Sequence, residues 1–269
     1  MMWIAIIILI LLTVLYLLAL GGRTGHPGLE ALRGWKYAHR GLHNETRPEN
    51  SMSAFQAAKE HGYGVELDVH MIKDGTLVVF HDDKLIRVTG QEGRVADLNA
   101  EQLKDYHLCG TEETIPTFRE VLDLFAGEVP LIIELKSDNG NCAALTDAVC
   151  RMLADYPGVY CVESFDPRCV VWLRKNRPEI IRGQLAENFF RSTTKLPAIL
   201  KWLLTAHLFN FLIKPDFVAY KFRDRNRPGT TLCRKLHKLQ GVSWTILSQS
   251  DLDLAIAEGW IPIFEGFEP

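Results

Sequence analysis

The nine residues Gly64-Val65-Glu66-Leu67-Asp68-Val69-His70-Met71-Ile72 alternate apolar and ionisable side chains. In an extended strand successive side chains point to opposite faces, so the valines, leucine and methionine share one face and Glu66, Asp68 and His70 share the other. Taken alone, this pattern is typical of an edge strand whose polar face meets water. The neighbouring sequence favours another interpretation, in which the ionisable face belongs to a reactive site.

A second strand follows this one after a short turn. Lys73-Asp74-Gly75 is a turn signal, and the apolar run 76–80 after it ends at His81-Asp82. Three residues cannot hold the crossover that a parallel pair needs, so the two runs are predicted to form an antiparallel hairpin. The hairpin returns His81 to the neighbourhood of Asp68.

A third run, residues 130–136, is mostly apolar but carries Glu134 and Lys136 on one face. It is too apolar for an edge strand, so these charges are expected to serve a purpose at a strand end. Residues 51–61 form a predicted helix with Asn50 or Ser51 as N-cap and Gly62 as stop.

Strand-like runs recur along the chain with helical patterns between most of them. Strands that alternate with helices predict an α/β fold with a parallel sheet, and eight such units predict a closed TIM-type (β/α)8 barrel. A doubly wound open sheet is the alternative. Leaving out the hairpin arm at 77–80, the predicted strands are 36–39, 65–69, 131–135, 160–164, 180–184, 217–220, 242–246 and 262–265.

The barrel prediction brings chemically active residues to one rim. His39, Asp68, Glu134, Ser164 and Trp244 all lie at or near the carboxyl ends of their predicted strands. Barrels of this type place their active sites at that end. Five separate strands therefore agree on one location for the site.

Composition limits the classes of function. The chain has 269 residues, 47% of them hydrophobic, and a net charge of only −3, which argues against nucleic acid as a partner. Outside the N-terminus we find no repeat, low-complexity tract or long linker, which indicates one domain. The six cysteines lack zinc-type spacing and are interpreted as reduced thiols that fill the core.

The N-terminus differs from the rest of the chain. Residues 3–20 are apolar and uncharged over a length typical of a membrane-spanning helix. A cleaved signal peptide is the alternative, but no basic residue precedes the run and the cleavage signal is poor. We expect an anchor at 1–22, a juxtamembrane linker at 23–35 and a barrel domain at 36–269. Because Arg23, Arg33 and Lys36 follow the anchor, the positive-inside rule places the barrel in the cytoplasm of a single-pass protein of the cell membrane.

Glu66, Asp68 and Glu134 at one rim require positive charge nearby. Two carboxylates about 4 Å apart repel by about 4 kcal/mol at an effective dielectric constant of about 20. Arg40 and Lys136 offset part of this repulsion, and oxygen ligands without His or Cys clusters indicate a hard cation, Mg²⁺ or Ca²⁺. Three carboxylates, two basic side chains and a doubly charged metal sum to about +1, and this charge suits a singly charged phosphodiester. A network neutralised only by Arg and Lys is the alternative.

An ordered set of motifs runs from about Tyr37 to the C-terminus. The motifs are Ala38-His39-Arg40-Gly41, Arg47-Pro48-Glu49-Asn50-Ser51, Val65-Glu66-Leu67-Asp68-Val69, Phe80-His81-Asp82, Leu85-Ile86-Arg87-Val88-Thr89-Gly90, Ile115-Pro116-Thr117-Phe118, Ile133-Glu134-Leu135-Lys136, Ser164-Phe165-Asp166-Pro167 and Trp244-Thr245. Each motif alone is weak, whereas their order and spacing together are specific. The set closely resembles the glycerophosphodiester phosphodiesterase family, in the form of a membrane-anchored bacterial-type member.

The resemblance implies a barrel of the phospholipase C-like phosphodiesterases and a metal-dependent hydrolysis of glycerophosphodiesters to glycerol 3-phosphate and an alcohol. It also implies a role for each matching residue. Metal ligands match Glu66, Asp68 and Glu134, and the acid/base pair matches His39 and His81, without saying which is acid and which is base. Groups that hold the substrate match Arg40, Lys136, Glu49 and Trp244. The chain's Glu-Asn-Ser and its ending at 264–269 depart from the commoner family sequences.

Two alternative functions are compatible with the same sequence. A lysophospholipase D-type or other lipid phosphodiesterase would use the same rim residues and differ in its loops. A catalytically silent lipid-binding protein is less favoured because all the matching residues are present. The apolar segment 196–213 contains Lys201 and is flanked by Lys195 and Lys214. It is interpreted either as a core-facing helix or as an interfacial helix that holds the mouth of the barrel against the bilayer.

Overall fold

The structure is a barrel closed by parallel pairing of its first and last strands. The computed structural model describes residues 1–138 and 140–269. In it β1 (Tyr37–His39) pairs with both β2 (Gly64–Met71) and β9 (Trp260–Phe264), which excludes the open sheet. The other parallel strands are β4 (Leu131–Leu135), β5 (Tyr160–Ser164), β6 (Arg182–Ala186), β7 (Phe217–Lys221) and β8 (Gln240–Ile246).

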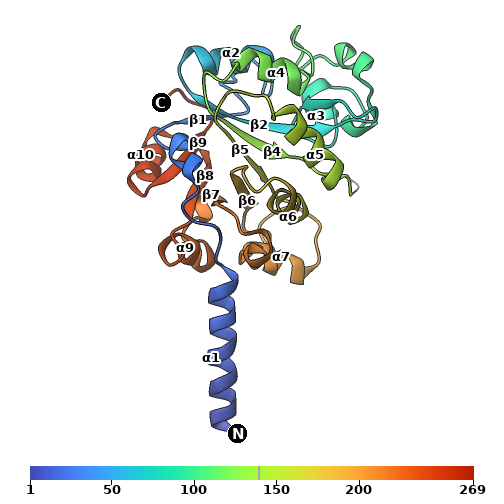
Figure 1. The fold of residues 1–269 in the computed structure, drawn as a ribbon. Helices are drawn as coiled ribbons and strands as arrows, with labels where there is room; N and C mark the ends of the chain where they lie inside the picture. Colours follow the sequence, from blue (N-terminus) through green and yellow to red (C-terminus); the bar gives the residue numbers. More distant parts are fainter. Residues whose placement is uncertain (139) are drawn as a thin grey trace.

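Helices surround this barrel, as Figure 1 shows. The predicted helix at 51–61 is confirmed as α2 (Met52–Glu60), whose N-cap Ser51 accepts a hydrogen bond from the amide of Ala54. The remaining helices of the barrel are α4 (Phe118–Phe125), α5 (Cys142–Met152), α6 (Pro167–Asn176), α7 (Ala198–Thr205), α8 (Asn210–Ile213), η4 (Phe222–Asp224), α9 (Pro228–Lys235) and α10 (Gln249–Ala257).

The alternation of β2 follows the prediction, but neither face meets water. Val65, Leu67 and Val69 are fully buried in the layer between strands and helices. Glu66 and Asp68, on the other face, are 3% and 0% exposed. The edge-strand interpretation is therefore excluded, and β2 supplies ionisable groups to the inside of the barrel.

The predicted hairpin is confirmed. β3 (Leu77–Val79) pairs antiparallel with β2, and the amide of Phe80 donates to the carbonyl of Asp68 at 3.0 Å, which brings His81 beside Asp68. The segment between β3 and α4 has its own small core, built on Phe80, Leu85 and Val95. It contains α3 (Ile86–Thr89), η2 (Val95–Asp97) and η3 (Ala100–Asp105).

Two predicted strands are displaced in the structure. The strand expected at 180–184 is β6 at Arg182–Ala186, because Ile180 and Ile181 pack into the core before pairing begins. The strand expected at 262–265 is β9 at Trp260–Phe264, which leaves Glu265 just beyond the strand end.

The N-terminal helix α1 (Met2–Ala19) extends away from the barrel in Figure 1. Its mean hydropathy is 2.9 and none of its residues is buried, so it is a candidate membrane span. A signal sequence can have the same length and hydropathy. After it, η1 (Pro27–Leu32) inserts Leu29 and Leu32 into the barrel's inner core, and the Tyr37 hydroxyl donates to the carbonyl of Leu32 at 2.9 Å. Residues 27–32 thus cover the end of the barrel at which the strands begin.

Candidate active site

Most of the predicted site residues converge on one pocket at the carboxyl ends of the strands. His39, Glu66, His81, Glu134 and Trp244 line it. It is also lined by Arg40, Glu163, Phe165, Leu185 and Ile263. A larger hollow lies between residues 46–53 and 100–120, but none of the predicted site residues lines it. The smaller pocket is therefore the candidate active site.

A left-handed turn after β1 aims the first residues of the site. Arg40 has a φ of 56°, and its amide donates to the carbonyl of Glu66 at 2.9 Å. The next residue, Gly41, has a φ of 82°, and a Cβ there would lie 2.9 Å from the carbonyl carbon of Ala54 in α2. Only glycine meets both conditions without strain, so this glycine fixes how closely the turn that carries Arg40 approaches α2.

Three carboxylates form the centre of the site. Glu66, Asp68 and Glu134 are buried, and each offers an oxygen within 4.8 Å of the others. The ammonium of Lys136 lies 2.7 Å from Oε1 of Glu134 and 3.0 Å from Oδ1 of Asp68. The resemblance implied a phosphate-holding role for Lys136, but here the lysine bridges two of the three carboxylates.

Burial and neighbouring charges divide these carboxylates into two kinds. Burial alone would raise the pKa of Asp68, but the charges of Lys136, His81 and Arg40 outweigh it and hold the pKa well below its usual range. Burial raises the pKa of Glu66 well above its usual range, and the charge of Asp68 adds to this. Burial also raises the pKa of Glu134, in spite of Lys136. The available cations therefore satisfy Asp68 but not the two glutamates.

The donor set fits a hard divalent cation. With Glu163, four carboxylates line this buried region, whereas Arg40 and Lys136 are the cations beside them. Oε2 of Glu163 is buried without a hydrogen-bond partner. Oxygen donors with uncompensated negative charge are what Mg²⁺ and Ca²⁺ bind. Arg40 and Lys136 do not offset the effect of burial on Glu66 and Glu134, whose pKa values stay raised.

Both predicted histidines are paired with a carboxylate through Nδ1. Nδ1 of His39 lies 2.6 Å from Oε2 of Glu265, and Nδ1 of His81 lies 2.6 Å from Oδ1 of Asp82. A proton on each Nδ1 satisfies these contacts and leaves Nε2 free to accept or deliver a proton. Burial lowers the pKa of His39, although the hydrogen bond to Glu265 opposes this.

A chain of ion pairs links the phosphate-binding candidates to His81. Glu49 accepts from Nη1 of Arg40 at 2.8 Å and from Nη2 of Arg87 at 2.7 Å. Arg87 also donates to Asp82, the partner of His81, at 2.5 Å. Glu49 does not line the pocket; it holds Arg40 in place from behind.

One wall of the pocket is aromatic. Trp244 packs edge-on against Phe165 with ring centroids 5.7 Å apart, and Phe165 packs in the same way against Phe189. The ammonium of Lys221 lies 5.2 Å from the centre of the Trp244 ring. This wall gives the polar pocket an apolar side.

Two further carboxylates of the site, Glu163 and Glu265, are not among the residues predicted from the sequence. Glu163 pairs with Glu134 in the β4–β5 register, so the alternation of Val162-Glu163-Ser164 was a signal that could have identified it. Ser164 was expected at the rim, but its hydroxyl donates to the carbonyl of Leu135 at 2.7 Å and does not line the pocket. Glu265 meets His39 only because β9 closes the barrel beside β1.

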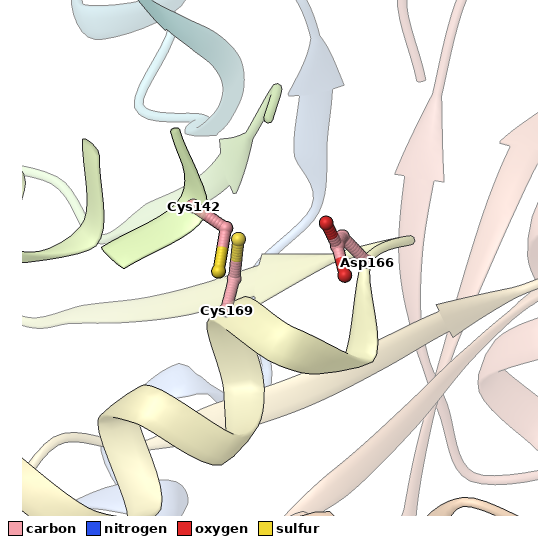
Figure 2. A group of neighbouring side chains, drawn as sticks. All are labelled: Cys142, Asp166 and Cys169. Carbon is pink, nitrogen blue, oxygen red and sulfur yellow. The ribbon is translucent and has the colours of Figure 1, made fainter. Parts of the chain in front are cut away.

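A second group of potential ligands, Cys142, Asp166 and Cys169, lies outside this site between α5 and α6 (Figure 2). Burial raises the pKa of Cys142 and raises that of Cys169 to about 12, which disfavours the thiolates that bind metals. Asp166 already accepts hydrogen bonds from Ser137 and Arg168. Among the described residues the cysteines are free thiols, and all except Cys109 are buried, as the sequence indicated.

Comparison with known proteins gives one consistent family. The model of the "Glycerophosphoryl diester phosphodiesterase family" matches residues 39–264. The chain is 32% identical over 157 residues to glycerophosphodiester phosphodiesterase 1 of Homo sapiens, covering 54% of this chain and 46% of that protein. It is 29% identical over 232 residues to a glycerophosphodiester phosphodiesterase of Caldanaerobacter subterraneus, covering 82% and 89%.

The human relative and one from Bacillus altitudinis are each matched over about half of their length, 46% and 44%. Among solved structures, the fold is similar to a phosphodiesterase of Oleispira antarctica in complex with the product sn-glycerol-3-phosphate. That comparison has a TM-score of 0.73 at 23% identity and covers 90% of this chain and 95% of the other. At this identity the likeness shows the barrel fold.

Proposed function

This chain belongs to the glycerophosphoryl diester phosphodiesterase family, and we propose that it hydrolyses glycerophosphodiesters to glycerol 3-phosphate and an alcohol with a divalent metal and two histidines. The observation that carries the proposal is the pocket itself. Three carboxylates that could hold a metal and two carboxylate-paired histidines meet there beside an arginine. The Oleispira antarctica phosphodiesterase, described with that product, supports the choice of product.

Glu66, Asp68 and Glu134 are the proposed metal ligands. Mg²⁺ or Ca²⁺ bound there would supply Lewis-acid polarisation of a phosphoryl oxygen. Lys136 then has less negative charge to neutralise, and its ammonium can turn toward the phosphate. Burial holds the pKa of Glu163, beside these ligands, well above its usual range, which favours its neutral form. The site therefore keeps the net positive charge that attracts a phosphodiester.

His39 and His81 are the proposed acid/base pair. One imidazole Nε2 accepts a proton from the attacking hydroxyl, and the other donates a proton to the departing alcohol oxygen. Glu265 and Asp82 hold the rings in the required tautomer and orientation. Arg40, fixed by Glu49, offers its guanidinium to the phosphate, and Trp244 packs beside the glycerol or alcohol group.

A product-release assay on the full-length chain tests this proposal. Glycerophosphocholine is the substrate, with Mg²⁺, with Ca²⁺ or with a chelator. Glu66→Gln and His39→Ala should each lower kcat by about 10²-fold or more. Glu45→Gln, an exposed glutamate in the loop after β1, is the matched control and should stay active. Full activity with the chelator, or in either site variant, would contradict the mechanism.

A lysophospholipase D-type activity is the second candidate. The aromatic wall of Trp244, Phe165 and Phe189 gives a place for an apolar substituent next to the phosphate-binding groups. Choline release from lysophosphatidylcholine in the same assay distinguishes the two. A faster turnover of lysophosphatidylcholine favours this candidate. A silent lipid-binding protein would release no product from either substrate.

The proposed organisation is an anchor at 1–22, a connection at 23–35 and a barrel domain at 36–269, with α1 across the cell membrane and the barrel in the cytoplasm. Arg33 and Lys36 after α1 support this orientation, while Arg23 is engaged with buried Asp216 at 2.5 Å. The thiol of Cys109 is exposed and can report the topology. A membrane-impermeant maleimide should label Cys109 only after cells are permeabilised. Labelling of Cys109 in intact cells would show that the barrel lies on the outer side of the membrane.

A further inference from the structure

Large apolar side chains are exposed on one side of the barrel, in and next to α7 and α8. Ile199 and Trp202 in α7 are 64% and 50% exposed, and Phe211 and Leu212 in α8 are 50% and 42% exposed. We call these four residues the α7–α8 face. The interpretation of 196–213 as a core-facing helix holds for Leu204 and Ile213, which are buried. The four side chains of the α7–α8 face stay exposed in the part of the chain that the structure describes.

The segments that flank this face carry only positive charge. Residues 188–215 and 225–250 contain no aspartate or glutamate, although the whole chain has a net charge of −3. Two of their basic residues are paired outside the segments, Arg191 with Asp224 and Arg225 with Glu258. The other basic residues are Lys195, Lys201, Lys214, Arg227, Arg234, Lys235 and Lys238. Apolar side chains among cations are typical of a surface that binds anionic lipid headgroups.

The same side of the barrel holds the base of α1. The side-chain amide Nδ2 of Asn210 in α8 donates to the carbonyl of Leu20 at 3.1 Å, and Nε2 of His237, just after α9, lies 2.8 Å from the carbonyl of Leu17. Lys214 contacts the carbonyl of Gly21 at 3.4 Å. Figure 1 shows α1 leaving the barrel between α7 and α9. Any bilayer that α1 spans therefore lies against these helices.

We infer that the α7–α8 face, with the lysines in and next to α7 and α9, docks on the surface of an anionic bilayer and holds the barrel at a fixed orientation to it. The inference rests on the proposed membrane insertion of α1. A second copy of the chain is a poor occupant, because a self-complementary contact would bring two sets of these cations together. An apolar and cationic surface beside a membrane-length helix matches a lipid surface instead.

Docking of this face would bring the active site close to the lipid. Leu200 and Leu204 of α7 pack with Phe189, and Phe189 packs on Phe165 of the pocket wall. The helix that carries the exposed Ile199 and Trp202 thus packs, through Leu200 and Leu204, on the aromatic wall of the pocket. A substrate with an apolar tail could reach the phosphate-binding groups along this side without leaving the bilayer surface.

Depth measurement on the full-length chain in nanodiscs tests the inference. An environment-sensitive dye is attached at Trp202→Cys, in a chain that also carries Cys109→Ser to remove the exposed native thiol. Leu254→Cys is the matched control, because Leu254 is 43% exposed but lies on α10 among Asp251, Asp253 and Glu258. Quenching by a lipid-borne quencher and by aqueous iodide is compared at the two positions, in anionic and in zwitterionic discs.

We expect the lipid-borne quencher to reduce dye fluorescence at position 202 several-fold more than at 254, and iodide to show the reverse order. Changing Lys195, Lys201, Lys235 and Lys238 to Gln should abolish the difference between anionic and zwitterionic discs. Equal lipid quenching at both positions would overturn the inference. Protection of position 202 from iodide without lipid quenching would also overturn it, by indicating a protein occupant.

Two controls separate this result from failure of the underlying proposals. A chain that does not co-purify with nanodiscs would refute membrane insertion of α1, and the docking inference with it. Product release by the same discs is measured in parallel. Hydrolysis of glycerophosphocholine without lipid quenching at position 202 would refute the docking alone and leave the proposed activity intact.

Discussion

At the scale of single residues, each of the two histidines has a carboxylate partner at Nδ1, and the two partners come from unrelated parts of the chain. Asp82 follows its histidine directly, whereas Glu265 reaches His39 from the far end of the sequence. Each carboxylate presents one acceptor to Nδ1 and leaves Nε2 toward the pocket. The pair is therefore matched in geometry, and differences in burial set the two rings apart: His39 is the more enclosed, with 12% of its side chain exposed against 30% for His81.

Glu265→Gln is predicted to change the pH profile as well as the rate. Glu265 opposes the lowering of the His39 pKa by burial, so its removal should lower that pKa further. We expect kcat/KM to fall by about 10²-fold, because orientation of an acid/base group is lost. The limb of the pH–rate profile that belongs to His39 should shift to lower pH. A shift of the acid limb identifies His39 as the base, and a shift of the alkaline limb identifies it as the acid.

The control for this variant is Glu268→Gln, three residues further along and 54% exposed. Its profile should match that of the unmodified chain. An unchanged profile for Glu265→Gln would show that Glu265 does not position His39.

Glu163→Gln is predicted to change how stability depends on pH. Burial, then the charge of Glu134, holds the pKa of Glu163 well above its usual value of 4.5. The folded chain keeps a proton that the unfolded chain releases above that pH, so this contribution is full below pH 4.5 and is lost as pH rises through the folded pKa. With chelator present, the unmodified chain should lose roughly 1.4 kcal/mol per pH unit relative to the variant over this window. Urea unfolding from pH 5 to 8 measures it, and parallel curves would contradict it.

At the scale of elements, local sequence predicted most of what builds the site. The alternation of β2 and the turn at Lys73-Asp74-Gly75 were sufficient to place Glu66, Asp68 and His81 together, because both depend on near neighbours in the chain. Lys136 was assigned to the correct strand end, but its contacts depend on β2 lying beside β4. Sequence predicts such contacts poorly, because they are set by packing between elements rather than within them.

The turn between β1 and α2 gives a prediction at this scale. Gly41→Ala adds a Cβ 2.9 Å from the Ala54 carbonyl carbon at a φ of 82°, whereas Gly34→Ala adds one in open space at a φ of 79°. Both should lose about 1–2 kcal/mol from the left-handed backbone. Gly41→Ala should lose about 1–3 kcal/mol more from overpacking. Denaturant unfolding of the two variants tests this, and equal losses would show that α2 yields freely.

At the scale of the whole molecule, closure of the barrel completes the site. Glu163 arrives from β5 and Glu265 from the end of β9, and neither is near the 37–82 segment in sequence. The eight-strand count correctly predicted the barrel and the shared rim. It did not reveal that a fourth carboxylate would lie beside the three selected, because Glu163 is one alternating strand residue among many until its neighbours are known.

Metal binding should stabilise the whole chain. Because the unfolded chain does not bring Glu66, Asp68 and Glu134 together, a cation that binds them favours the folded state. At about 100 times its Kd, Mg²⁺ or Ca²⁺ should add about 2.7 kcal/mol to the free energy of unfolding. Glu66→Gln should lose this gain and Glu45→Gln should keep it, as followed by thermal melting with and without chelator. A gain that survives in Glu66→Gln would place the metal elsewhere.

One rim pocket is proposed to hold both the metal and the phosphate, and a crystal structure of the full-length chain with Ca²⁺ and glycerol 3-phosphate tests this arrangement. We predict one cation with oxygens of Glu66, Asp68 and Glu134 at about 2.3–2.6 Å. The phosphate should lie beside it, within hydrogen-bond distance of Arg40 and of Nε2 of His39 or His81. A cation bound elsewhere, or a phosphate outside this pocket while Lys136 still bridges Asp68 and Glu134, would contradict the account.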